Sequence, residues 1–181
     1  TDDRQDPFTY LVPDRDKYFR NPNFCNRVSF DYSLLEKEKP NDDTKEAYLK
    51  ELFNVVEKKS YQYSTENKDN VNGVFTIVEF ITKRTANTFY PLAKEANSFF
   101  DNIVILSGTI LEPRRRMIIS ALKSKCYSNS KLLLITTQVV EAGVDIDMDL
   151  GFKDKSLIDS EEQLAGRINR NCNKDNCKLY L

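Results

Sequence analysis

From residue 74 onward, the chain alternates short apolar runs with stretches of helical periodicity. Residues 74–80, 102–106 and 131–136 are rich in Val, Ile, Leu and Phe, and their apolar residues are continuous instead of alternating. A continuous apolar run of strand length indicates burial on both faces, which is typical of parallel strands covered by helices. The sequence therefore predicts an α/β fold, a three-layer sandwich with a mostly parallel central sheet and helices on both faces.

Helical and apolar patterns predict the other elements of this part of the chain. Pro113 suits the first turn of a helix with an inward apolar stripe. That stripe would be made by Met117, Ile118, Ala121 and Leu122, and we further expect helices over residues 85–97 and about 159–168, and short strands over 147–151 and 177–181.

Residues 1–72 differ in character, because they are polar and irregular and hold four of the six prolines. We expect a linker segment here, packed on a domain formed by residues 73–181. Its predicted elements are a strand over residues 26–34, a helix over 44–59 capped by Asp42 or Asp43, and an exposed loop over 60–73.

Composition excludes several classes of function. The 181 residues include no histidine, which rules out Ser-His-Asp and Cys-His nucleophiles, a histidine general base and histidine-ligated metals. The 27 Lys+Arg balance 28 Asp+Glu, so a uniformly basic nucleic-acid binder is excluded, although a local basic patch is not. No apolar run approaches the roughly 20 residues of a membrane helix, and the polar start is no signal peptide. We expect a cytoplasmic protein without membrane contact.

Cysteine spacing gives a weaker signal. Cys172 and Cys177 are separated by four residues, whereas Cys25 and Cys126 stand alone. Cys172 and Cys177 could bind a metal or form a disulfide, but a structural zinc site needs about four ligands. We expect free thiols and no metal site.

Two polar segments could carry chemistry. Residues 135–147, ITTQVVEAGVDID, follow a predicted buried strand, and small polar residues with free backbone N–H groups suit sugar-phosphate oxygens. An ordinary strand-to-helix connection is the alternative. In residues 159–170, DSEEQLAGRINR, the spacing of Gln163, Arg167 and Arg170 predicts one shared helical face that could bind phosphates. Cations that favour a helix C-terminus are the alternative there.

Taken together, the two segments resemble a known family. T-x5-G-V-D-I at residues 137–146 and Q-x2-G-R-x2-R at 163–170 resemble the fifth and sixth motifs of superfamily 2 helicases. The sequences of both segments are closely similar to those of the CRISPR-associated helicase-nucleases of type I interference systems. ITKRTA at 81–86 resembles the fourth motif of that family, and ILSGTILEPRRR at 105–116 resembles the strand, turn and helix that follow it.

The resemblance implies the second RecA-like domain of an ATP-dependent helicase motor, and a chain that is part of a longer protein. No G-x4-G-K-S/T loop occurs in the sequence, so ATP and Mg²⁺ would be held mainly by the first RecA-like domain, and this chain alone would be inactive. Across the cleft, Arg167 and Arg170 would act as arginine fingers, Gln163 would orient the attacking water or touch the γ-phosphate, and Gly143 and Asp145 would face the nucleotide.

The resemblance also implies contacts with nucleic acid. The implied partners are single-stranded DNA, the first RecA-like domain and a CRISPR RNA-guided surveillance complex. Leu164 and Ile81 depart from the family pattern, which usually has Arg and Asn there. A non-catalytic RecA-like nucleic-acid-binding module and the motor half of another superfamily 2 helicase stay open as alternatives. The residues expected to contact the DNA backbone are Thr82, Ser107, Gly108, Thr109, Thr136, Thr137 and Gln138.

Overall fold

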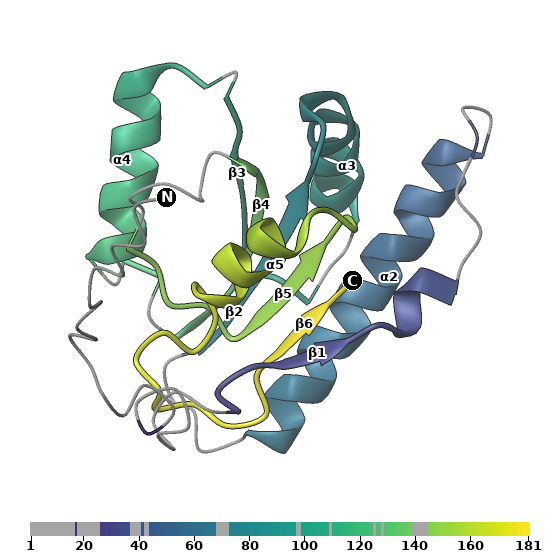
Figure 1. The fold of residues 1–181 in the computed structure, drawn as a ribbon. Helices are drawn as coiled ribbons and strands as arrows, with labels where there is room; N and C mark the ends of the chain where they lie inside the picture. Colours follow the sequence, from purple (N-terminus) through teal and green to yellow (C-terminus); the bar gives the residue numbers. More distant parts are fainter. Residues whose placement is uncertain are drawn as a thin grey trace, which may run out of the picture.

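The central feature is a parallel sheet, which confirms the predicted fold class. A computed structural model describes residues 17, 26–36, 41, 44–67, 73–96, 99–108, 110–124, 126–127, 129–138 and 145–181. Within these residues six strands form one sheet in the order β1-β6-β5-β2-β4-β3, and every neighbouring pair is parallel (Figure 1). The strands are β1 (Ser29–Asp31), β2 (Gly73–Phe80), β3 (Asn102–Leu106), β4 (Ser130–Thr137), β5 (Leu150–Lys153) and β6 (Lys178–Tyr180).

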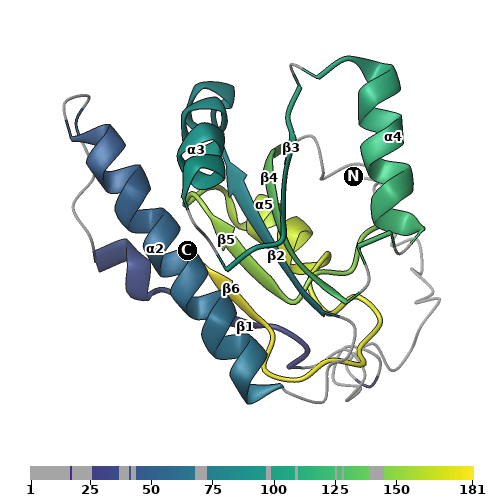
Figure 2. The same ribbon diagram turned by 180° about the vertical axis from the view of Figure 1, so that it is seen from behind.

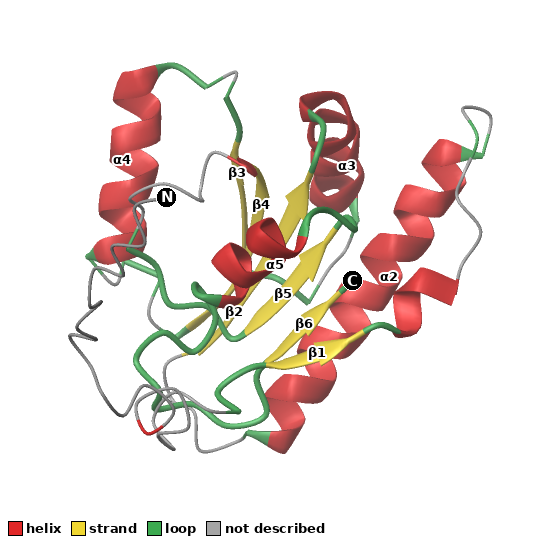
Figure 3. Ribbon diagram, viewed as in Figure 1, coloured by secondary structure: helices red, strands yellow, loops and turns green. Residues whose placement is uncertain are grey.

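Helices cover both faces of the sheet, as predicted (Figures 2 and 3). On one face the Ser60 hydroxyl of α2 lies 2.8 Å from the Thr76 hydroxyl of β2, and Phe89 of α3 packs edge-on against Phe80 of β2. On the other face α5 contributes the buried side chain of Leu164. The helices are α2 (Lys45–Glu66), α3 (Lys83–Glu95), α4 (Glu112–Lys123) and α5 (Ile158–Ala165), with a 3-10 turn, η1 (Ser33–Glu36).

Helix α2 is longer than predicted. It continues to Glu66, so the expectation of an exposed loop is wrong for residues 60–66. Ser60 and Tyr63 are buried because their hydroxyls meet polar groups of the sheet region, Thr76 and Asp149. Asp42 and Asp43, expected to cap this helix, lie outside the described residues.

Helix α4 is less buried than predicted. None of its residues is fully buried, and Met117 is 65 % exposed, so the prediction of an inward stripe that includes Met117 is wrong. Ile118 and Leu122 are half-buried and pack against the core. Because α4 lies beside β3, the edge strand, there is less sheet for it to cover (Figure 1).

The first described segments attach to the far edge of the sheet. β1 pairs with β6 in parallel, with Phe30 opposite Leu179. Helix α2 then crosses one face of the sheet (Figure 2). In the described part of the chain, no helix has the length and apolar character needed to cross a membrane.

Candidate functional site

The two arginines lie in a loop and not on a helix. α5 ends at Ala165, so the prediction that Gln163, Arg167 and Arg170 share one helical face is wrong. Gly166 caps the helix, and Asn169 then adopts a left-handed backbone with φ 45°, which turns the chain away from the helix axis. We call residues 166–174 the arginine loop.

Backbone hydrogen bonds hold the arginine loop beside residues 145–149, the acidic segment. Met148 N–H donates to the Arg167 carbonyl at 2.9 Å, and Asn169 N–H donates to the Met148 carbonyl at 2.8 Å. These two bonds form an isolated parallel bridge between Met148 and Ile168. The structure therefore brings together the two motifs that the sequence separates.

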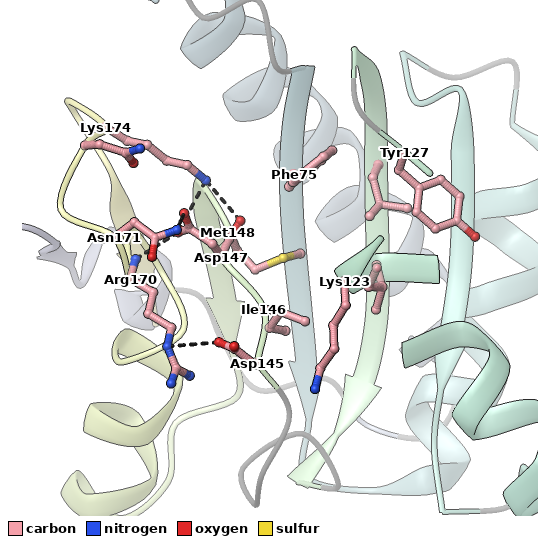
Figure 4. A pocket seen from close by; sticks show the side chains of 13 residues that line it. Phe75, Lys123, Tyr127, Asp145, Ile146, Asp147, Met148, Arg170, Asn171 and Lys174 are labelled. Atoms are coloured by element: carbon pink, nitrogen blue, oxygen red, sulfur yellow. Dashed lines mark hydrogen bonds and ion pairs between the residues drawn. The ribbon is translucent and has the colours of Figure 1, made fainter. Parts of the chain in front are cut away.

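Arg167, Arg170 and Asp145 meet at this junction. Arg170 Nε lies 3.2 Å from Asp145 Oδ1, and both side chains are substantially exposed (Figure 4). Partial burial and the nearby Arg170 cation lower the pKa of Arg167, and Asp145 partly opposes this shift. Two guanidiniums close enough to repel each other suit an anion with several oxygens, such as a phosphate chain. Gly143 lies outside the described residues, and Gln163 is exposed in the last turn of α5.

A hollow of about 390 Å³ opens beside Arg170. Its wall includes charged groups of both signs and aromatic rings, so it offers donors, acceptors and apolar surface together. α4 supplies one side and the arginine loop the other (Figure 4). The lining residues are Phe75, Leu122, Lys123, Tyr127, Leu132, Asp145, Ile146, Asp147, Met148, Arg170, Asn171, Asn173 and Lys174.

The residues predicted to contact DNA gather at the carboxyl ends of three neighbouring strands. Thr82 follows β2, Ser107 and Gly108 follow β3, and Gln138 follows Thr136 and Thr137 at the end of β4. In the sheet order β2-β4-β3, these ends form one continuous edge, which we call the carboxyl edge. Thr109 lies outside the described residues.

Burial divides this group in two. Thr82, Gly108 and Gln138 are exposed, whereas Ser107, Thr136 and Thr137 are buried. The Thr136 hydroxyl donates to the Leu106 carbonyl at 2.8 Å, and the buried Thr137 hydroxyl has no hydrogen-bond partner within the described part of the chain. Sequence reasoning identified the edge but not which of its side chains reach solvent, because the last residues of β4 stay enclosed between β2 and β3.

Sequence reasoning missed two residues that shape the arginine loop. Asn169, 3 % exposed, donates from Nδ2 to the Lys174 carbonyl at 2.7 Å and accepts from Lys174 N–H at 3.0 Å, which closes the loop. Lys174 in turn lies 3.4 Å from Asp147 and 3.2 Å from Asp149. The available signal was the asparagine-rich run after Gly166, since Asn is enriched at left-handed positions.

The cysteines differ in accessibility, and this predicts their reactivity. Cys126 and Cys172 are exposed free thiols, whereas burial raises the pKa of the Cys177 thiol to about 11. Because the thiolate is the reactive form, iodoacetamide near neutral pH should modify Cys126 and Cys172 and leave Cys177 intact until the chain unfolds. Peptide mass spectrometry measures this, and early labelling of Cys177 would contradict it. Among the described residues, no group of three or more His, Cys, Asp and Glu side chains could hold a metal ion.

Comparison with known protein sequences identifies one family. The Cas3-like C-terminal family model, described as CRISPR-associated nuclease/helicase Cas3, C-terminal, matches residues 72–173. The CRISPR-associated nuclease/helicase Cas3 of Methanothermobacter thermautotrophicus is 38 % identical over 74 residues, which are 41 % of this chain and 9 % of that protein.

Solved structures show the same fold. The T. fusca Cas3–AMPPNP structure has a TM-score of 0.54 at 21 % identity, over 67 % of this chain and 16 % of that one. Domain 2 of the DEAD-box helicase Mss116p bound to an RNA duplex has a TM-score of 0.55 at 20 % identity, over 74 % of this chain and 50 % of that one. The chain thus spans a small part of the Cas3 proteins it matches. Since the family model covers more than half of it, the chain belongs to the Cas3-like C-terminal family, and its fold is that of a RecA-like domain.

Proposed function

We propose that this chain is the second motor domain of an ATP-dependent helicase that moves along single-stranded DNA in CRISPR interference. The observation that carries the proposal is the meeting of Arg167, Arg170 and Asp145 at one junction. In this proposal residues 73–181 form the motor domain, and residues 1–72 are the linker segment packed on it. The CRISPR RNA-guided surveillance complex would bring the DNA.

The arginine loop fits an ATP phosphate chain held by a first RecA-like domain. Arg167 and Arg170 would reach across the cleft as arginine fingers, Gln163 would orient the attacking water, and Gly143 and Asp145 would face the nucleotide. Arginine fingers contribute about 10³–10⁵ in rate because they stabilise charge that develops in the transition state. The paired guanidiniums supply that positive charge, whereas Mg²⁺ would be held mainly by the first domain.

The carboxyl edge would grip the DNA backbone. Exposed Thr82, Gly108 and Gln138 are available at the surface for direct contact. Thr109 and the buried Ser107, Thr136 and Thr137 complete the proposed set, the buried ones by shaping the turns after their strands. ATP binding would close the cleft and hydrolysis would open it, so that the grip on the strand alternates.

Another superfamily 2 motor is the second candidate, and one observation favours it. Mss116p domain 2, whose fold is similar, was solved with an RNA duplex. A non-catalytic nucleic-acid-binding module is the third candidate. The family match favours the CRISPR motor over both.

The test compares the chain alone with the protein that joins it to its first RecA-like domain. We expect the joined protein to hydrolyse ATP faster with single-stranded DNA than with RNA, and the isolated chain to show no ATPase activity and weak DNA binding that falls with salt. Steady-state ATP turnover and filter binding at several salt concentrations measure this. Equal stimulation by RNA would favour the second candidate, and no turnover by the joined protein would favour the third.

A further inference from the structure

We infer that Asp147 is a positioning residue that fixes the arginine loop so that Arg170 points toward the nucleotide. This inference rests on the proposed role of Arg170 as an arginine finger. As a positioning residue, Asp147 needs no contact with the nucleotide. It acts through the backbone of the loop, whereas Asp145 pairs with the Arg170 guanidinium.

The two carboxylate oxygens of Asp147 bind two successive residues of the loop. Oδ1 accepts from the backbone N–H of Arg170 at 2.8 Å, and Oδ2 accepts from the side-chain amide of Asn171 at 2.8 Å. Figure 4 shows Arg170, Asn171 and Lys174 gathered around Asp147. The carboxylate therefore determines both the position and the direction of the peptide that carries Arg170.

Lys174 connects Asp147 to the core of the domain. Its Nζ lies 3.0 Å from the Asp147 carbonyl oxygen and 3.2 Å from Asp149 Oδ1. Asp149 is buried and accepts hydrogen bonds from Phe75 N–H of β2 and from the Tyr63 hydroxyl of α2. The side chains of Lys174 and Asp147 are 15 % and 21 % exposed, so solvent screens their attraction less than it screens a surface ion pair.

The arginine loop is also closed internally, by hydrogen bonds between Asn169 and Lys174. The Asn169 side chain binds the backbone of Lys174 and so closes the segment 169–174. Its Nδ2 also donates to the Arg27 carbonyl at 3.0 Å. The bonds with Met148 and Arg27 hold the loop at residues 167–169, and the Asp147 carboxylate adds the contact at the Arg170 peptide itself. Catalytic groups need placement within about 0.5 Å, and a misplacement of about 1 Å can cost about 10²-fold in rate.

Asp147→Asn is the informative variant because it keeps the shape and changes the hydrogen bonding. An amide at this position would place one donor against the Asn171 amide and would remove the anion beside Lys174. In the full-length protein we expect kcat for ATP hydrolysis to fall by about 10- to 100-fold with little change in the KM for ATP. Asp175→Asn is the matched control, since Asp175 is an exposed carboxylate just after the same loop; it should leave both constants unchanged.

Two further variants separate positioning from a general effect on folding. Asp147→Asn combined with Asn171→Asp exchanges acceptor and donor, and we expect it to recover most of the lost kcat. In an Arg170→Ala background, Asp147→Asn should cause no further loss in single-turnover hydrolysis, because it acts through Arg170.

The outcomes distinguish this inference from the proposed function. Wild-type turnover by Arg170→Ala would overturn the proposed finger role of Arg170, on which this inference rests. Loss of turnover by Arg170→Ala together with wild-type turnover by Asp147→Asn would overturn only the positioning role. The positioning role would also be overturned by an exchange variant no faster than Asp147→Asn alone, or by equal losses in both backgrounds.

Discussion

Arg170→Ala is expected to lower kcat for DNA-stimulated ATP hydrolysis by about 10³-fold or more while the domain stays folded. The Arg170 side chain is 40 % exposed and its partner Asp145 is 66 % exposed, so their ion pair contributes little to stability. The loss would therefore reflect missing charge at the transferred phosphate. Single-turnover hydrolysis in the joined protein measures the rate, and the thermal unfolding midpoint tests whether the fold is retained.

Arg116→Ala is a matched control for this prediction. Arg116 is an exposed arginine that pairs with a carboxylate, Glu112, at 3.0 Å, far from the arginine loop in sequence. It should retain wild-type turnover. Arg167→Ala should lose activity as Arg170→Ala does, and full turnover by both loop variants would show that the arginine-finger assignment is wrong.

The sequence predicted three of the strands well because a buried parallel strand leaves a continuous apolar run. The strands expected at 26–34 and 147–151, which lack such a run, have wrong bounds: β1 covers only Ser29–Asp31, and β5 covers Leu150–Lys153. The strand expected at residues 102–106 is β3 without change, and β2 and β4 extend their predicted ranges by one residue at most at either end. Helix ends were less predictable, because polar side chains with distant partners replace apolar ones. Tyr63 lies in the unpredicted last part of α2, and its hydroxyl donates a hydrogen bond to Asp149. No local sequence pattern reveals a contact between residues so far apart in the chain.

The motifs identified the candidate site residues, but the sequence did not predict the backbone conformation around them. Helical periodicity placed Arg167 and Arg170 on a helix, whereas Gly166 and the left-handed Asn169 put both in a loop. Asn169 owes its conformation to contacts with Lys174 and with Arg27, which lies far away in the sequence. Such contacts depend on the completed fold, so spacing alone could not predict them.

Lys153→Ala is expected to destabilise the domain by about 3–5 kcal/mol. Lys153 of β5 and Glu79 of β2 are direct neighbours in the sheet and form an ion pair, and each side chain is 1 % exposed. Removing the ammonium group would leave the Glu79 carboxylate buried without this counter-charge. The free energy of unfolding, measured from the urea midpoint, tests the prediction. Lys50→Ala is the control, because the Lys50–Glu46 pair lies in solvent and its loss should not shift the midpoint.

The double replacement Glu79→Leu with Lys153→Met should recover most or all of the stability lost in Lys153→Ala. Apolar side chains of similar volume carry no desolvation cost, and exchanging a whole buried ion pair is often neutral or stabilising by about 1–4 kcal/mol. A double variant as unstable as Lys153→Ala would show that the pair is needed for its geometry. β2 ends two residues before Thr82, and β5 ends just before Asp154, which accepts a hydrogen bond from Ile81 N–H. If the double variant is stable but DNA no longer stimulates its ATP hydrolysis, the buried pair positions the carboxyl edge for function.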